Sequence, residues 1–171
     1  MKIVTAYRGR LTNSGFSLME LIISTGILMI LISVLTTLFG QILDVQLQSK
    51  STSSVDENSR FILARLSYDM QSASKIVTPA TPGQQSDTLQ ITINSVDYVY
   101  TLDSNGNLLL TKNSQSNQLN SNAVTISGLT FTRIGNGDNN DTVRMAFTVT
   151  TKTSQTSGKE QKSYQTTLGL Q

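Results

Sequence analysis

The stretch of this 171-residue chain that decides its architecture is Phe16–Leu43, which reads FSLMELIISTGILMILISVLTTLFGQIL. From Leu21 to Leu43 it holds 23 consecutive uncharged, mostly apolar residues. As a helix this run would extend about 35 Å, which is enough to cross the hydrocarbon core of a bilayer. It is longer than the apolar core of a secretory signal peptide, and no small-residue cleavage site follows it. We therefore expect a single membrane-spanning helix that stays with the mature protein.

Charges on the two sides of this run differ in sign. The first 15 positions hold three basic residues and no acidic one. They are Lys2, Arg8 and Arg10. After the run the first charge is Asp44. Because cytoplasmic flanks of membrane spans are enriched in Lys and Arg, we expect residues 1–15 in the cytoplasm and residues 44–171 outside it.

Glu20 is the unusual residue of the span, because an isolated carboxylate is costly where the apolar run begins. One interpretation is local. Ser17-Leu18-Met19-Glu20 matches the S-x-x-E capping box of a helix start. The other interpretation comes from the wider context of this motif.

The string Gly15-Phe16-Ser17-Leu18-Met19-Glu20-Leu21-Ile22, after a short basic leader, resembles the prepilin processing site of the type IV pilin and pseudopilin superfamily. The resemblance implies that a prepilin peptidase cuts between Gly15 and Phe16 and that the new amine of Phe16 is methylated. It also implies that Glu20 neutralises the α-amine of a neighbouring subunit during assembly. A carboxylate and an ammonium attract strongly in low dielectric, although each must lose its hydration, so the pair would mainly fix register.

A weaker resemblance involves Arg60–Met70, which is similar to the helix that follows the membrane span in J-type minor pseudopilins and PilW-like minor pilins. Together the two resemblances imply a minor structural subunit of a type IV pilus, a type II secretion pseudopilus or a DNA-uptake pseudopilus. The implied partners are other subunits, the prepilin peptidase, the inner-membrane assembly platform and membrane lipid. The chain departs from many major pilins in having no Pro before Pro79, so no Pro kink is expected in the span. A membrane-anchored extracytoplasmic binding module that does not polymerise remains the alternative.

Beyond the span, the pattern predicts that the helix continues to about residue 76. Ile62, Leu66, Met70 and Ala73 recur at helical spacing and predict one apolar stripe. The helix-spaced charged pairs, such as Arg65 with Asp69, are expected on a solvated face where they contribute little. The Ser- and Thr-rich interval 49–54 has poor helix propensity, which is compatible with a flexible juncture. If the helix nevertheless continues through it, from about residue 17 to 76, it would be roughly 90 Å long.

After Pro79 and Pro82 the apolar period changes to two, which predicts six short strands. They begin near Leu89, Val96, Leu108, Val124, Val143 and Tyr164, and Gly128 is the expected site of a β-bulge. So few strands cannot bury both faces, so the apolar helix stripe should cover one of them. The predicted fold class is α+β, with a long N-terminal helix packed on a small antiparallel sheet. Its parts are a leader at 1–15, a membrane and assembly segment at 16–43, an extracytoplasmic helix at 44–78 and a β-rich head at 79–171.

The loop Gly135–Asp141, GNGDNND, is the most ligand-like segment of the head. Asp138, Asn140 and Asp141 offer the carboxylate and amide oxygens that calcium selects. The loop lacks the spacing and the bidentate Glu of an EF-hand, and a hairpin loop between the Phe131 and Val143 strands is the simpler explanation. Calcium is therefore one of two readings of this loop.

Composition argues against most other classes of function. The chain has no His and no Cys, so His-based acid–base catalysis and thiol nucleophiles are excluded, and no Ser lies in a G-x-S-x-G setting. We therefore expect a protein that is not an enzyme. Its 13 basic and 11 acidic residues leave a net charge of +2, and only 6% of residues are aromatic, so no nucleic-acid-binding surface is expected.

Overall fold

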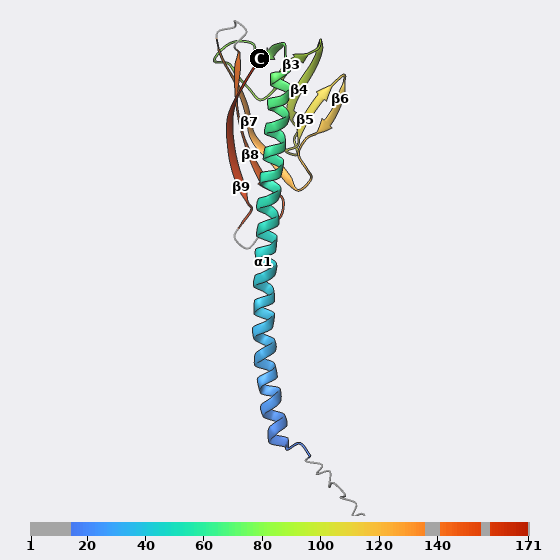
Figure 1. The fold of residues 1–171 in the computed structure, drawn as a ribbon, viewed down its shortest axis with the longest axis vertical. Coiled ribbons are helices and arrows are strands. Elements are labelled where there is room, and N and C mark those ends of the chain that lie inside the picture. Colours follow the sequence, from blue (N-terminus) through green and yellow to red (C-terminus); the bar gives the residue numbers. More distant parts are fainter. Residues whose placement is uncertain (1–14, 136–140, 155–157, 171) are drawn as a thin grey trace, which may run out of the picture. The chain divides into compact units, whose positions relative to one another are not determined.

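A computed structural model describes residues 15–135, 141–154 and 158–170 (Figure 1). These residues form one helix, α1 (Leu18–Gln71), and two antiparallel sheets. One sheet has the order β1-β3-β4-β5-β6 and the other has the order β2-β7-β8-β9. The strands are β1 (Lys75–Thr78), β2 (Gln85–Ser86), β3 (Leu89–Ile93), β4 (Val96–Leu102), β5 (Leu108–Lys112), β6 (Gln115–Gln118), β7 (Val124–Ile134), β8 (Thr142–Thr151) and β9 (Gln161–Gly169). The predicted α+β class with a long N-terminal helix is confirmed.

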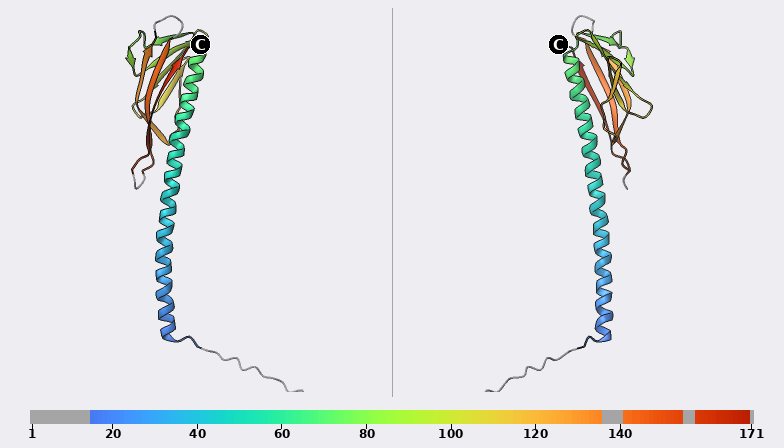
Figure 2. Two further views of the ribbon diagram at one scale, coloured as in Figure 1. Left: turned by 60° about the vertical axis from the view of Figure 1, so that its left-hand side comes forward. Right: turned by 90° about the vertical axis from the view of Figure 1, so that its right-hand side faces the viewer.

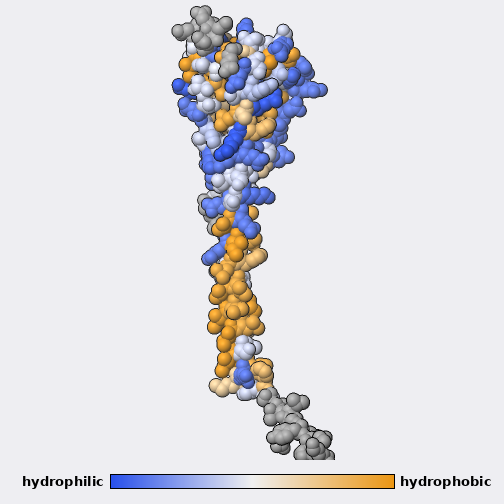
Figure 3. All heavy atoms as spheres, in the orientation of Figure 1, coloured by the Kyte–Doolittle hydropathy of each residue, from blue (hydrophilic) through white to orange (hydrophobic). Residues whose placement is uncertain are grey.

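The chain divides into two compact units, one ending at Leu43 and one beginning at Asp44. In the first unit every described residue of α1 is exposed, and apolar side chains dominate the face of the helix that Figure 3 shows. The hydroxyls of Thr25, Thr36 and Thr37 donate to backbone carbonyls one turn earlier at 2.9–3.0 Å. These polar groups are therefore already hydrogen-bonded within the helix, which lowers the free-energy cost of placing them in an apolar environment. This segment has the length and composition of a membrane span, and a single-pass anchor is compatible with it.

In the second unit, both sheets lie on the same side of the helix, as the two turned views show (Figure 2). The predicted stripe is confirmed for Ile62, Leu66 and Met70, which have no exposed surface. Ala73 is also buried, but it lies beyond the end of the helix at Gln71. They belong to one core cluster with the inward residues of both sheets. The helix therefore serves as the cover for sheets that could not bury their inner faces alone.

One expectation about this helix is wrong. The helix does not reach residue 76 but ends at Gln71, because Lys75–Thr78 forms β1 instead. The N–H of Ser74 donates to the carbonyl of Thr92 at 2.9 Å, and Lys75 pairs with Thr92 across the sheet. Of the two readings of residues 49–54, the continuous helix is confirmed, and Ser51 among them is buried. Packing against the head outweighs weak propensity at these positions.

The described part of the chain has nine strands in two sheets, where six strands in one sheet were expected. All six predicted strands are present. The three additional ones are the short strands β1, β2 and β6, and β6 has the all-polar sequence QSNQ with every residue exposed. Its hairpin to β5 turns at Asn113-Ser114, and the β3–β4 hairpin turns at Asn94-Ser95, all four residues having positive φ. These are the backbone signs that two-residue hairpins require.

The two sheets meet where Gly106 of the β4–β5 turn contacts β7. The carbonyl of Gly106 accepts from the N–H of Ile126 at 2.8 Å. Two residues further along β7, Gly128 has φ +61° and the β7–β8 register shifts between Ser127 and Thr130. The predicted bulge at Gly128 is therefore confirmed, and it lies next to the joint between the sheets.

Gly106→Ala should destabilise the head by about 2–4 kcal/mol, since it combines a strained positive φ with a clash. Gly106 has φ +76°, and an added Cβ would lie 3.0 Å from the Ile126 carbonyl oxygen and 3.2 Å from the Thr125 Cβ. Gly83→Ala is the matched control, because Gly83 has φ +82° but open space around the new Cβ. Urea unfolding followed by tyrosine fluorescence should show the larger loss for Gly106→Ala. Equal losses in the two variants would mean that the joint tolerates the added methyl group.

Candidate functional site

The predicted processing junction lies just ahead of the helix. Gly15 and Phe16 have no helical structure, and the ring of Phe16 is 75% exposed. The first intrahelical bond runs from the N–H of Leu21 to the carbonyl of Ser17 at 3.1 Å, which makes Ser17 the N-cap residue. The peptide bond between Gly15 and Phe16 is therefore accessible and free of helical constraint. Cleavage there remains a prediction.

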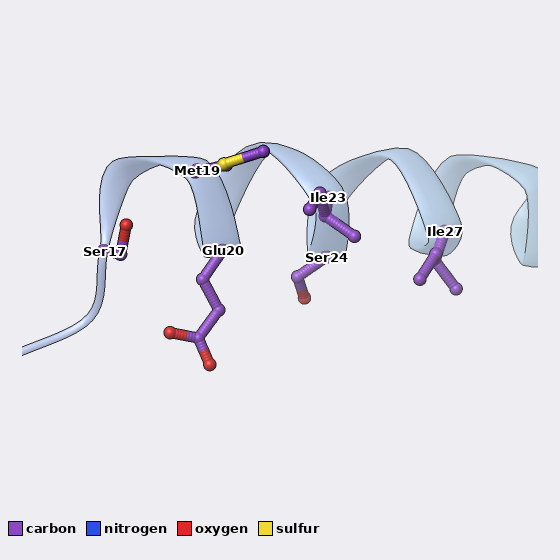
Figure 4. A pocket seen from close by; sticks show the side chains of 6 residues that line it. All are labelled: Ser17, Met19, Glu20, Ile23, Ser24 and Ile27. Carbon is purple, nitrogen blue, oxygen red and sulfur yellow. The ribbon is translucent and has the colours of Figure 1, made fainter.

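Glu20 lies in the first turn of α1, and its side chain extends from the helix on the same side as Ser24 and Ile27 (Figure 4). These residues line an open hollow along the helix together with Ser17, Met19 and Ile23. Within the described residues, the Glu20 carboxylate has no hydrogen-bond or ion-pair partner, so the capping box with Ser17 is not formed. A carboxylate here therefore has to find its partner outside this chain or remain hydrated.

The apolar surface around Glu20 also has no partner among the described residues of its own unit, 15–43. Large apolar side chains between Leu18 and Leu43 are 44–77% exposed. An uncovered surface of this extent marks contact with lipid or with other proteins. Glu20 is thus a charged residue within an apolar surface that lipid or another protein is expected to cover.

The residues predicted as a calcium site are only partly described. Asp138 and Asn140 lie outside the described residues. Asp141 is buried and forms an ion pair with the Arg133 guanidinium, which also donates to the carbonyls of Pro79 at 3.2 Å and Ala80 at 2.6 Å. In residues 15–135, 141–154 and 158–170, no three Asp, Glu, His or Cys residues cluster as metal ligands. Asp141 therefore links the start of β8 to Arg133 of β7 and, through Arg133, to the 79–80 loop.

Calcium remains a prediction, to be tested on melting temperature. If the loop binds calcium, adding millimolar calcium should raise the melting temperature relative to chelator, by a stability gain of about 2.7 kcal/mol at one hundred times the dissociation constant. An Asp138→Ala variant should lose this response and keep the Asp141–Arg133 pair. Identical wild-type curves in calcium and in chelator would leave residues 135–141 as an ordinary hairpin loop.

Two polar clusters that sequence reasoning missed attach α1 to the sheets. In the first, Asp69 is only 2% exposed and accepts hydrogen bonds from the Arg65 Nε at 2.7 Å and from the Tyr100 hydroxyl of β4. Burial, followed by the Asp69 carboxylate, raises the pKa of Tyr100 well above its ordinary value. The expectation that Arg65 and Asp69 form a solvated pair is therefore wrong. Periodicity placed Asp69 beside the apolar stripe but could not show that Tyr100 meets it there.

The second cluster joins the helix to β9. Lys162 Nζ donates to the Asp56 carboxylate at 2.9 and 3.1 Å, and the Tyr164 hydroxyl donates to the same group at 3.1 Å. These bonds, Lys162 first, lower the pKa of Asp56, and the bond to Asp56 raises the pKa of Lys162. The ring of Tyr164 stacks on Phe147 of β8 with centroids 5.5 Å apart. The Asp56 carboxylate on the helix thus holds the side chains of Lys162 and Tyr164 on the inward face of β9.

Asp56→Asn should lower the melting temperature near neutral pH by a few degrees, because the Lys162 ammonium loses its counter-charge. The folded-state pKa of Asp56 lies below its ordinary 3.8, so its contribution is present above that pH and disappears as the pH falls through the folded value. The raised pKa of Lys162 likewise maintains the contribution until the pH rises through and beyond 10.5. Melting curves across pH should therefore differ between wild type and variant in the neutral range and converge in acid. Glu57→Gln, at the neighbouring exposed carboxylate, is the control that should show no such pH-dependent difference.

Comparisons of the chain with protein-family models, with curated proteins and with solved structures gave no match. The structure itself defines the architecture of the chain. The chain combines a long N-terminal helix, apolar enough to span a membrane in its first half, with an antiparallel β head packed on the second half, which is a pilin-like architecture.

Proposed function

We propose that this chain is a structural subunit of a type IV filament, most like a minor pilin or a pseudopilin. The observation that carries the proposal is an accessible Gly15–Phe16 junction followed by a fully exposed apolar helix whose one charge, Glu20, has no partner among the described residues. A free-standing membrane anchor needs the apolar surface but has no use for a carboxylate at this depth. A polymerising subunit uses both, since neighbouring helices cover the surface and a neighbour's amine neutralises the charge.

In this proposal the chain exists first as a membrane-inserted precursor and then as a processed filament subunit. Before assembly the segment 16–43 spans the inner membrane with residues 1–15 in the cytoplasm and the head outside, in line with the basic leader. The prepilin peptidase then removes the leader and exposes the amine of Phe16, which is methylated. On entry into the filament through the assembly platform, lipid contacts of the helix are exchanged for contacts with other subunits. Glu20 fixes the register of each subunit by pairing with the amine of its neighbour.

The head fits a structural role of this kind. Its polar clusters around Asp69 and Asp56 serve packing, since they join the helix to the sheets. The Arg60–Met70 resemblance favours a minor subunit over a major one. A type IV pilus, a secretion pseudopilus and a DNA-uptake pseudopilus would each use such a subunit.

The test is recovery of the chain in sheared filaments. The tagged chain is produced in a host with a type IV filament, in matched strains with and without the prepilin peptidase, and followed by immunoblot in sheared and membrane fractions. We expect it in the sheared fraction only when the peptidase is present, with an unrelated inner-membrane protein as the fractionation control. Retention in the membrane in both strains would favour an anchored binding module that does not polymerise.

A further inference from the structure

A row of polar side chains runs straight across the outward face of the sheet β2-β7-β8-β9, whose last three strands lie side by side (Figure 1). The register pairs Gln85 with Thr132, Thr132 with Arg144, and Arg144 with Thr167. Thr132 is half-buried and the other three residues are exposed. Because residues opposite one another on adjacent strands share a face, the four side chains form one row, about 14 Å across at the usual strand spacing.

Arg144 is the one charged residue of these strands that has no partner in the part of the chain that the structure describes. The four strands contain no Asp or Glu. Their other cations, Arg133 and Lys162, lie on the inward face and pair with Asp141 and Asp56. The Arg144 guanidinium instead faces outward and is exposed. The charge that complements this face of the sheet is therefore negative.

The side chains beside the guanidinium keep their hydrogen-bonding capacity. Elsewhere on this face two hydroxyls satisfy each other, since those of Thr148 and Ser163 share a hydrogen bond at 2.9 Å. The side chains of Gln85, Thr132 and Thr167 form no hydrogen bond with any other described residue. The row therefore offers one amide and two hydroxyl groups around a single cation.

Small side chains border Arg144 along its own strand. The outward residues before and after it on β8 are Thr142 and Ala146, and the Thr142 hydroxyl donates to the carbonyl of Ile134 at 2.6 Å. Gly169, which lies opposite Thr142 on β9, adds no side chain. A planar acid can therefore reach the guanidinium from the side, which is the geometry of a bidentate pair.

We propose that this outward face binds a carboxylate-bearing sugar, a uronate residue of an acidic polysaccharide. Arg144 binds the carboxylate through two parallel N–H donors, and the side chains of Gln85, Thr132 and Thr167 bond the hydroxyls of the sugar ring. The proposal concerns the head alone and does not rest on the filament function.

The charge and the polarity of the row select this class of ligand. Nucleic acids and anionic membranes present many charges and are bound by several cations together, whereas this row has one. Protein partners are anchored mainly by large apolar or aromatic side chains. On the outward face of these strands, the one large apolar side chain is Ile134, at the end of β7. A uronate combines a single charge with several hydroxyls, and a single guanidinium among hydroxyls and an amide complements both.

The test is an NMR titration of the full chain in micelles of an uncharged detergent that has no sugar headgroup. The ligands are sodium glucuronate and glucose, which share a ring, although only glucuronate has a carboxylate. Millimolar glucuronate should shift the Arg144 Nε–H signal and the backbone amides of Thr132 and Thr167. Glucose should bind at least about tenfold more weakly, because it lacks the charged hydrogen bonds. Sodium acetate, which has the carboxylate but no hydroxyls, should also bind more weakly.

Matched variants assign the binding to the row. Arg144→Gln should weaken glucuronate binding at least about tenfold, and Arg144→Lys, which keeps the charge without the planar fork, should weaken it less. Arg60→Gln removes an exposed arginine of α1 and should bind like the wild type. Thr167→Val should weaken binding, while Thr150→Val, on the same face but further along β8, should not. All four positions are exposed or half-buried, so the variants should keep the wild-type melting temperature.

Three outcomes would overturn the proposal. One is that glucose or acetate binds as tightly as glucuronate. Another is that Arg144→Gln and Arg60→Gln bind glucuronate alike. The third is that a polyglutamate peptide binds this face more tightly than an oligoglucuronate of equal charge, which would assign the face to an acidic protein instead.

Discussion

Glu20→Ala is expected to remove this chain from sheared filaments while leaving its processing and its head intact. Glu20 lies beyond the predicted scissile bond and makes no hydrogen bond or ion pair within the described chain, so its loss costs the subunit nothing in isolation. In the proposed filament, its loss would leave a neighbour's ammonium without a counter-charge among apolar helices, which is strongly destabilising. The measurement is the ratio of sheared to membrane-bound chain by immunoblot, which should fall below detection.

Two further substitutions sharpen this result. Glu20→Gln keeps the shape and removes the charge, so it should fail as Glu20→Ala does. Ser24→Ala changes a residue on the same side of the helix, shown beside Glu20 in Figure 4, and should assemble normally. Wild-type amounts of Glu20→Ala in the filament would reduce Glu20 to a residue of the helix start with no role in assembly.

Gly15→Val is expected to block processing and to keep the chain at its unprocessed mass. The peptidase must reach the bond after Gly15 at the membrane edge, and the resemblance implies that it accepts a Gly there. A Cβ added at Gly15 meets no atom within 4 Å, so misfolding would not explain the loss. Intact-mass measurement should show the wild type without residues 1–15 and the variant with them.

The control for processing is Gly26→Ala, which also places a methyl group in open space, but inside the helix. It should be processed like the wild type, because Ala is a better helix former than Gly. A wild-type chain that retains Lys2 through Gly15 in a host with an active peptidase would contradict the pilin interpretation altogether.

Helical and strand periodicity predicted most of this fold because the apolar pattern extends over many residues in the helix and in the main strands. The stripe Ile62, Leu66 and Met70 and the alternation in β3, β4, β7 and β8 identify buried faces directly. Strand β6 could not be predicted in this way. Its four residues are all polar and exposed, and it exists because the Asn113-Ser114 turn returns the chain along β5. The two sheets are linked by the hydrogen bond between Gly106 and Ile126, which no local sequence pattern encodes.

The functional residues likewise include some that the sequence predicted and others that it did not. Gly15, Phe16 and Glu20 were predicted because their motif is contiguous in sequence, and the structure adds that Glu20 has no partner among residues 15–135, 141–154 and 158–170. Asp69 was assigned to solvent because its partner Tyr100 is 31 residues away and on another element. Contacts over such separations depend on how helix and sheet pack, and one sequence without that packing gives no sign of them.

The way α1 enters the core has a mechanical consequence. Its buried apolar side chains run from Val55 to Met70, which is about 22 Å of helix at 1.5 Å per residue. A pull applied along the helix from the Asp44 end loads these contacts in shear, together with the Asp56–Lys162 and Asp69–Tyr100 bonds at the two ends of the buried stretch. All must yield at once for the helix to slide out, whereas a pull across the helix would open them one after another. The head is therefore built to resist tension along the axis of the helix segment that it buries.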